Sequence, residues 1–240
     1  MDRFFPHIER RVYRRSFLTE MSVKLAYSRN EDFGEWAQRA IESFALPGNP
    51  QISLDDESLL VDSPVCQMRF DPEFCVMAFR PDYFDSFDKV LALIKENAEI
   101  FESCCSNKIK SISVGKANWI PAKAKRDDVP GIGITAAIFS ENLRPGENRI
   151  SPIEGISVSN VTETTILCDS YQLEISHGFT SSKSDSSRVF AILNFEAKDA
   201  RPCAFSTCLK RLQEMNQLIF DAFHWCVSQN LIDAMEGADR

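Results

Sequence analysis

The chain has 240 residues and a formal net charge of −8 at pH 7, with 44% hydrophobic and 26% charged residues. This length suits one large domain or two small halves, and the composition is that of a globular protein. The negative charge excludes a broad electrostatic attraction to nucleic acid or anionic lipid, although a local basic patch stays possible. We therefore expect neither a nucleic acid nor a membrane as a partner.

Most of the eight cysteines lie inside apolar patterns, as reduced core cysteines do. The N-terminal sequence MDRFFPHIERRVYRRSFL has no apolar core of the kind found in a signal peptide. No stretch approaches the roughly 18 apolar residues of a membrane-spanning helix. These features predict a cytoplasmic protein with reduced thiols.

Strict alternation from Tyr13 to Tyr27 predicts a long strand with one buried face. Four arginines at its start either guard a strand end by charge, which we favour, or bind an anion; they are Arg10, Arg11, Arg14 and Arg15. A helix capped by Asn30 or Asp32 follows and ends before Pro47.

The next part of the chain predicts short strands, then a helix, then a strand. In chain order these elements are Gln51 to Leu54, Ser58 to Val61, Val65 to Phe70, Phe74 to Phe79, a helix from about Ser86 to Phe101, and a strand from Lys108 to Ile120. The unbroken apolar run from Phe74 to Phe79 suits a strand inside a sheet.

The segment PAKAKRDDVPG, residues 121–131, breaks every periodicity and predicts a boundary between two halves, residues 1–120 and residues 132–240. One intimately packed domain is the alternative. Residues 132–139 fit a helix or a strand equally. An antiparallel meander follows, with predicted strands at Gly155 to Asn160, Thr164 to Cys168, Tyr171 to His177 and Arg188 to Glu196.

Thr207 to Val227 carries the longest apolar stripe of the chain and predicts a long helix on which the strands pack. A short terminal helix, Leu231 to Met235, follows it. Together the elements predict an α+β protein with a mostly antiparallel sheet in two similar halves, helices packed on one face and a long C-terminal helix.

Three stretches carry a resemblance: YRRSFLTEMSVKLAYS from Tyr13, SISVGKANWI from Ser111, and LNFEAKD with LKRLQEMNQLIFDAFHWCVSQNLIDAM near the C-terminus. They are similar to the opening strand, the middle strand and the final strand and helix of a sporadically distributed bacterial family of about this length. The family's middle strand resembles "RIGLRYIN", and its last helix resembles "LH..I...F...IT..L...M".

The chain departs from this family at polar positions. Ser111 and Gly115 stand where the family has arginines, Asn216 replaces a histidine and Ser228 a threonine, which leaves Asn118 as the polar match of the middle strand. The resemblance implies a fold and a bacterial origin rather than an activity. The family's patchy distribution implies an association with mobile or defence genes.

Few residues have a pattern that points to chemistry. His177 ends a predicted strand beside Gly178 and a serine-rich loop, where binding sites occur, so Asn118 and His177 are our candidate ligand-binding residues. His224, three residues after Asp221, fits a surface histidine beside a carboxylate better than a catalytic base. No catalytic residue is assigned.

Cysteine and histidine positions near the C-terminus could be written as a zinc motif: Cys203, Cys208, His224 and Cys226. Cys208 and Cys226 belong to the buried stripe, whereas His224 faces elsewhere, so we expect no metal. Gly131-x-Gly133 lacks the setting of a phosphate loop, and no cofactor is expected. The adjacent Cys104 and Cys105 suggest packing rather than a redox switch.

These observations favour a non-catalytic module that binds another protein or a second copy of itself. Two alternatives remain open at this stage. One is a module that binds a small apolar ligand in a cavity under the long helix, which the 18 phenylalanines permit. The other is an enzyme that uses His177 or Asn118 with nearby acids.

Overall fold

The computed structural model describes residues 4–55, 57–80, 82, 86–105, 108–122, 138–143, 160–168, 170–181 and 189–237. The strands in this part of the chain are β1 (Leu18–Tyr27), β2 (Gln51–Leu54), β3 (Leu59–Asp62), β4 (Cys66–Asp71), β5 (Phe74–Phe79), β6 (Ile109–Ala122), β7 (Asn160–Cys168), β8 (Tyr171–Ser181) and β9 (Val189–Asp199). They form one sheet with the order β2-β3-β4-β5-β1-β6-β9-β8-β7, in which every pair is antiparallel.

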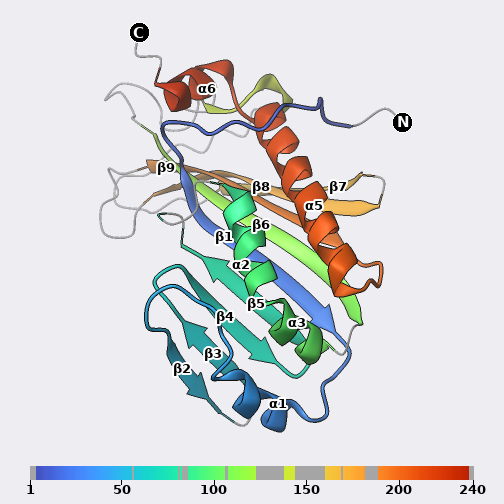
Figure 1. Cartoon of the computed structure of the whole chain (residues 1–240). Helices are drawn as coiled ribbons and strands as arrows, with labels where there is room; N and C mark the ends of the chain where they lie inside the picture. The colour runs from blue at the N-terminus through green and yellow to red at the C-terminus, as the bar shows by residue number, and fades with distance from the viewer. Residues whose placement is uncertain are drawn as a thin grey trace.

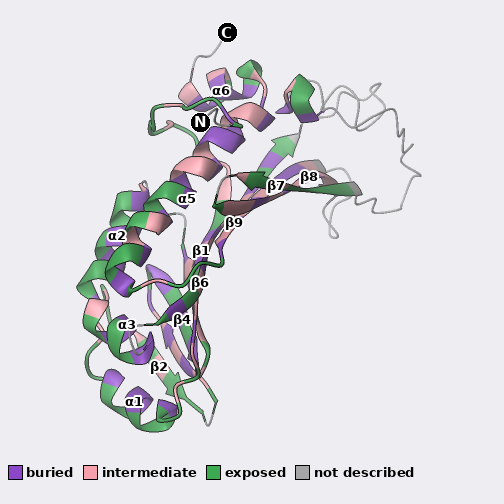
Figure 2. Ribbon diagram, turned by 90° about the vertical axis from the view of Figure 1, so that its right-hand side faces the viewer, coloured by how far each residue is buried: buried purple, intermediate pink, exposed green. Residues whose placement is uncertain are grey.

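The helices of the described chain are α1 (Phe33–Ala40), α2 (Phe87–Glu96), α3 (Ala98–Cys105), α5 (Phe205–Cys226) and α6 (Gln229–Glu236), with a short 3-10 helix, η2 (Glu141–Leu143). Helices α1, α2, α3 and α5 cover one face of the sheet, and no described helix lies on the other face (Figure 2). Helix α6 lies at one end of the molecule beside the N-terminal segment (Figure 1). The predicted α+β class, antiparallel sheet and one-sided helix layer are therefore confirmed.

The two halves of the sheet repeat one plan on either side of the β1–β6 pair. The first half runs from β1 through the meander β2–β5 to the helices α2 and α3. The second half runs from β6 through the meander β7–β9 to α5. Each meander ends beside the first strand of its own half, so β1 and β6 meet in the interior of the sheet.

Alternation within each strand separates a helix-covered face from a bare face. In β1, the side chains of Met21, Val23, Leu25 and Tyr27 are at most 3% exposed and form part of the core. Their neighbours along the strand point to the opposite face, since successive side chains of a strand alternate. The sheet bends so that this opposite, bare face is the hollow one (Figure 2).

The helix predicted from Ser86 to Phe101 is two helices, α2 and α3, with the break at Asn97. The Asn97 side chain is buried, and its amide donates to the carbonyl of Leu93 at 2.9 Å and to that of Ala45 at 3.1 Å. Its Oδ1 accepts from the Ala45 amide at 2.8 Å. The break therefore anchors the chain that follows α1, because an asparagine side chain can replace main-chain partners.

The strand predicted to begin at Tyr13 begins instead at Leu18. The preceding residues cross α5 and α6, where the Arg15 amide donates to the Met235 carbonyl at 3.1 Å (Figure 1). Alternating side chains could not reveal this course, because the segment's partners are more than 200 residues away in the sequence.

Two predictions for the second half lie largely outside the described residues. They concern the strand Gly155 to Asn160, of which only the last residue is described, and residues 132–139. The expected boundary, residues 121–131, overlaps the last two residues of β6 and otherwise also lies outside the described ranges.

Helix α5 lies against β6 and β9 and buries its long stripe there. The buried apolar residues of the helix are Phe205, Cys208, Leu212, Met215, Ile219, Ala222, Phe223 and Cys226. The Phe223 ring makes an edge contact with Phe195 of β9, with ring centroids 6.4 Å apart. The sequence predicts a long helix on which the strands pack, and the burial of these side chains against the sheet is the physical basis of that packing.

Replacing Phe223 by Asp tests the stripe. The substitution places an unpaired carboxylate among apolar groups and removes a buried ring, which together should lower the free energy of unfolding by more than about 3 kcal/mol. Gln213→Asp, on the exposed side of the same helix, is the matched control and should change stability little. Thermal melting of both variants measures the difference, and equal melting temperatures would show that the stripe is not buried.

Candidate functional site

The bare face is the surface formed by the outward-facing side chains of all nine strands opposite the helix layer. Carboxylates outnumber basic groups on it: Glu20, Asp62, Asp71, Glu163, Glu174 and Glu196 against Lys24, Arg69 and Lys198. Part of this charge is neutralised locally, since Lys198 contacts Glu174 at 2.9 Å and Glu196 at 3.3 Å. The face as a whole is acidic, which disfavours a phosphate backbone as its partner.

Short side chains occupy the middle of the bare face. They are Ser22 and Ala26 of β1, Ala78 of β5, and Ser111, Ser113, Gly115 and Ala117 of β6. Gly115 faces Ser22, and a Cβ added at residue 115 would lie 2.7 Å from the Ser22 Oγ. A side chain at residue 115 would therefore require the Ser22 hydroxyl to move, and the side chains that line the centre of the bare face are short.

Larger apolar side chains lie to one side of this centre, on β6, β9 and β7. We call Trp119, Phe190, Ile192 and Val161 the apolar patch. Trp119 is 45% exposed and Val161 is 41% exposed, whereas Ile192 is 8% exposed and therefore buried. The ring centroids of Trp119 and Phe190 are 5.8 Å apart, and Trp119 pairs with Ile192 across the β6–β9 ladder. Sequence reasoning missed this patch, although Trp119 stood at an outward position of an alternating strand.

Asn118 and His177 lie on the helix-covered face, not on the bare face. They belong to β6 and β8, and Leu193 of β9 pairs with both, so one strand separates them. The Asn118 amide donates to the Leu193 carbonyl at 2.9 Å. His177 is 5% exposed beside the Phe139 ring, and burial lowers the pKa of its imidazole, which favours the neutral form. The structure brings the two residues to one face without bringing them into contact.

Lys116, next to Asn118 on the same face of β6, points at helix α5. Its Nζ donates to the Oδ1 of the buried Asn216 at 2.6 Å and lies 5.8 Å from the Phe87 ring centroid. Burial, and then repulsion from Arg10, lower the pKa of the Lys116 amine to about 8. This hydrogen bond joins β6 to the last long helix, α5.

The polar side chains on the outer side of α5 hold the N-terminal segment. The carboxylate of the buried Asp221 accepts from the Ile8 amide at 2.9 Å and from Gln217 at 2.8 Å. The Tyr13 hydroxyl and the His224 Nε2 are 2.6 Å apart. His224 and Asp221 therefore each have a structural partner in this segment.

The thiols of Cys104 and Cys105 are fully buried. The Cys104 thiol donates to the Tyr27 hydroxyl at 3.0 Å, which in turn donates to the Asp71 carbonyl at 2.8 Å. Burial raises the pKa of Cys104 to about 12, so this thiol stays protonated at neutral pH. Among the described residues, no group of three or more histidine, cysteine or acidic side chains is placed to hold a metal ion.

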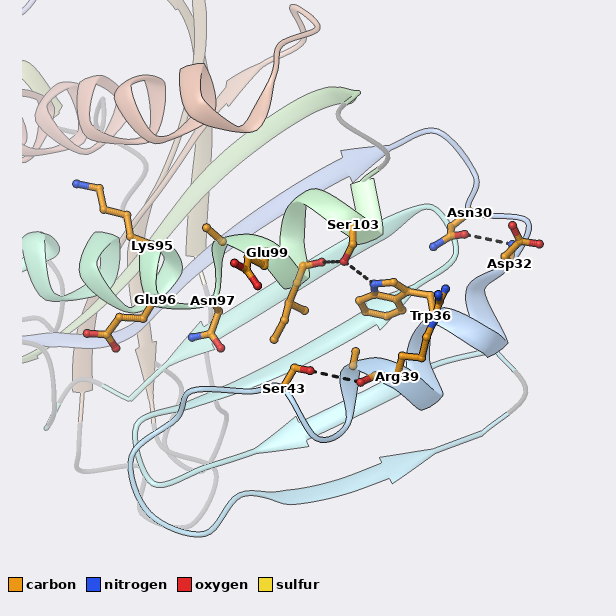
Figure 3. A pocket seen from close by; sticks show the side chains of 13 residues that line it. Asn30, Asp32, Trp36, Arg39, Ser43, Lys95, Glu96, Asn97, Glu99 and Ser103 are labelled. Atoms are coloured by element: carbon orange, nitrogen blue, oxygen red, sulfur yellow. Dashed lines mark hydrogen bonds between the residues drawn. The ribbon is translucent and has the colours of Figure 1, made fainter.

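A pocket of about 740 Å³ lies between α1 and the α2–α3 pair. The Trp36 indole donates to Ser103 Oγ at 3.0 Å at one end of it, and Lys95 and Glu96 lie at the other end (Figure 3). Its charged side chains are spread along the walls instead of converging on one point (Figure 3). Asn97, which lines it, is already bonded to main-chain groups, so the pocket has the character of a surface groove between helices.

Comparison of the sequence with models of known protein families and with curated proteins finds no match. No helix in the described ranges is both long and apolar enough to cross a membrane. The function is therefore inferred from the two faces of the sheet and their side chains.

The Lys116 amine should titrate apart from the other lysines. In an NMR titration of the protein with carbon-labelled lysines, one lysine should have a titration midpoint near pH 8. The Lys116→Met substitution should remove the signal of that lysine. Because the folded-state pKa lies below the usual 10.5, this amine's contribution to stability should rise as the pH increases from about 8 to about 10.5. A midpoint for Lys116 near 10.5 would show that its amine is solvated.

Proposed function

We propose that the protein is a non-catalytic binding module whose bare face receives another protein. The observation that carries this proposal is the apolar patch around the 45% exposed Trp119, on the hollow sheet face where the described part of the chain places no helix (Figure 2). Exposed aromatic groups in a concave setting are typical anchors of protein interfaces, where tryptophan is enriched among the residues that dominate binding.

The charge of the bare face determines the kind of partner. Glu20 and Glu163 have exposed carboxylates, and the carboxylates of the bare face outnumber its basic groups even though Lys198 contacts both Glu174 and Glu196. A partner surface with an apolar centre and basic side chains around it would complement this arrangement. Nucleic acid would be repelled by the same carboxylates.

The helix-covered face supports the alternatives less well. Its polar groups Lys116, Asn118 and Asp221 each bond to a neighbouring residue within the fold. The stripe of α5 packs against β6 and β9, and the pocket between α1 and the α2–α3 pair is not lined by residues of α5. A module with its binding surface on the bare face fits these observations best.

Site-specific photocrosslinking in the native host would test the proposal. A photoreactive residue at Glu20, on the bare face, should capture a discrete protein, whereas one at Lys210, on the exposed side of α5, should not. Trp119→Ala should weaken the capture about tenfold or more, because truncating an interface tryptophan commonly costs over 1.4 kcal/mol. Its melting temperature should fall by no more than about 4 °C, since Trp119 is half exposed.

Added salt should weaken the same capture, because the carboxylates of the bare face are solvent-exposed. Equal capture from Glu20 and Lys210, or capture that Trp119→Ala leaves unchanged, would contradict the proposal. Recovery of a nucleic acid at Glu20 in place of a protein would also overturn it.

A further inference from the structure

The two edges of the sheet differ in how they are protected. Edge strand β2 has four residues, with Pro50 directly before it and Asp55 directly after it. Short length, proline and charge are the usual means by which proteins block pairing at a sheet edge. Strand β2 is thus poorly suited to receive another strand.

Edge strand β7 has none of these protections. It has nine residues with the sequence NVTETTILC, in which Glu163 is the only charged residue and proline, lysine and arginine are absent. Residues 161–165 are exposed, and Leu167 is 79% exposed. Within the described chain, β8 is the only strand that pairs with β7. Its threonine-rich, β-branched composition favours strand pairing.

We propose that β7 pairs antiparallel with β7 of a second copy, about a twofold axis at Thr164, so that two sheets become one. When the whole of β7 is paired, the centre falls on Thr164, which then faces its own copy. Each residue pairs with the one equally far on the other side of Thr164. Both bare faces lie on the same side of the joined sheet, because paired residues share a face.

The sequence of β7 is complementary to itself in this register. Val161 lies opposite Leu167, so the two exposed apolar side chains of the strand cover each other. Glu163 lies opposite Thr165 instead of its own copy, which avoids a directly opposed pair of carboxylates. A centre at Glu163 would create that pair and leave the end of the strand unpaired. Such self-complementarity is what a twofold interface requires.

This contact overlaps the protein-binding role proposed for the bare face at one residue, Val161. It uses the main-chain edge of β7 with the Val161 and Leu167 side chains, whereas the partner contact is centred on Trp119 and Phe190. A failure of self-association would therefore leave the capture experiment at Glu20 unaffected, and the reverse also holds.

Sedimentation of the full chain over a range of concentrations tests the association with two charge variants. Wild type should form a dimer. V161K/L167K places like charges opposite each other in the proposed register and should weaken the dimer at least tenfold. V161E/L167K places opposite charges there and should restore it. Both pairs of substitutions are at exposed positions, so the melting temperatures of the two variants should remain similar.

Disulfide formation tests the register directly, in a Cys168→Ser background that removes the natural thiol of the strand. Thr164→Cys should give a covalent dimer, because paired Cα atoms lie about 4.5 to 5.5 Å apart. Thr162→Cys is the matched control. In the proposed register the two cysteines at position 162 would be four residues apart along the strand, a distance of about 13 Å, which a disulfide cannot span.

A monomer at every concentration tested would overturn the proposal. Equal crosslinking at residues 162 and 164 would refute the register, as would equal association of V161K/L167K and V161E/L167K. A dimer that persists in all charge variants would place the contact elsewhere on the molecule.

Discussion

The antiparallel pairing of β1 with β6 is the interaction on which the rest of the structure depends. Each strand is the first of its half, and each also pairs with the last strand of its own meander. The β1–β6 ladder thereby turns two small sheets into one and gives both halves a common core. Gly115 leaves room for the Ser22 side chain across this ladder on the bare face, since an added Cβ would lie 2.7 Å from the Ser22 Oγ unless that hydroxyl moved.

The helix layer follows from this central pair. Helix α5 is one continuous helix that packs on β6 and β9. The first half of the sheet is covered in part by α2 and α3, which are separated by Asn97. Asn97 uses its side chain to fix the loop after α1, so that α1, α2 and α3 together cover the first half as three shorter helices. With all of these helices on one side, the other face is left to the strands' outward side chains, among them Trp119.

Sequence patterns located elements better than they located partners. Alternation identified β4 and β6, and an unbroken apolar run identified β5, because the sequence of a strand shows directly which of its side chains are apolar. Such local patterns could not show that Tyr13 lies outside β1 and contacts His224, or that Lys116 donates to Asn216, because these partners are distant in the sequence. They also did not show that α2 ends at Asn97, whose side chain bonds to main-chain groups of Leu93 and Ala45. Asn118 was chosen as the polar match to the resembled family and His177 from the end of a predicted strand, and the structure places both on the helix-covered face. The bare face emerged only when the strand order put outward residues of nine strands side by side.

Amide hydrogen exchange across β1 and β6 tests the central claim most directly, because it measures whether the two halves are one cooperative unit. The slowest-exchanging amides should lie in β1, β5, β6 and β9, and all should exchange with the free energy of global unfolding. Earlier exchange of the β1–β6 ladder, with the two halves still protected and opening at different free energies, would contradict the account.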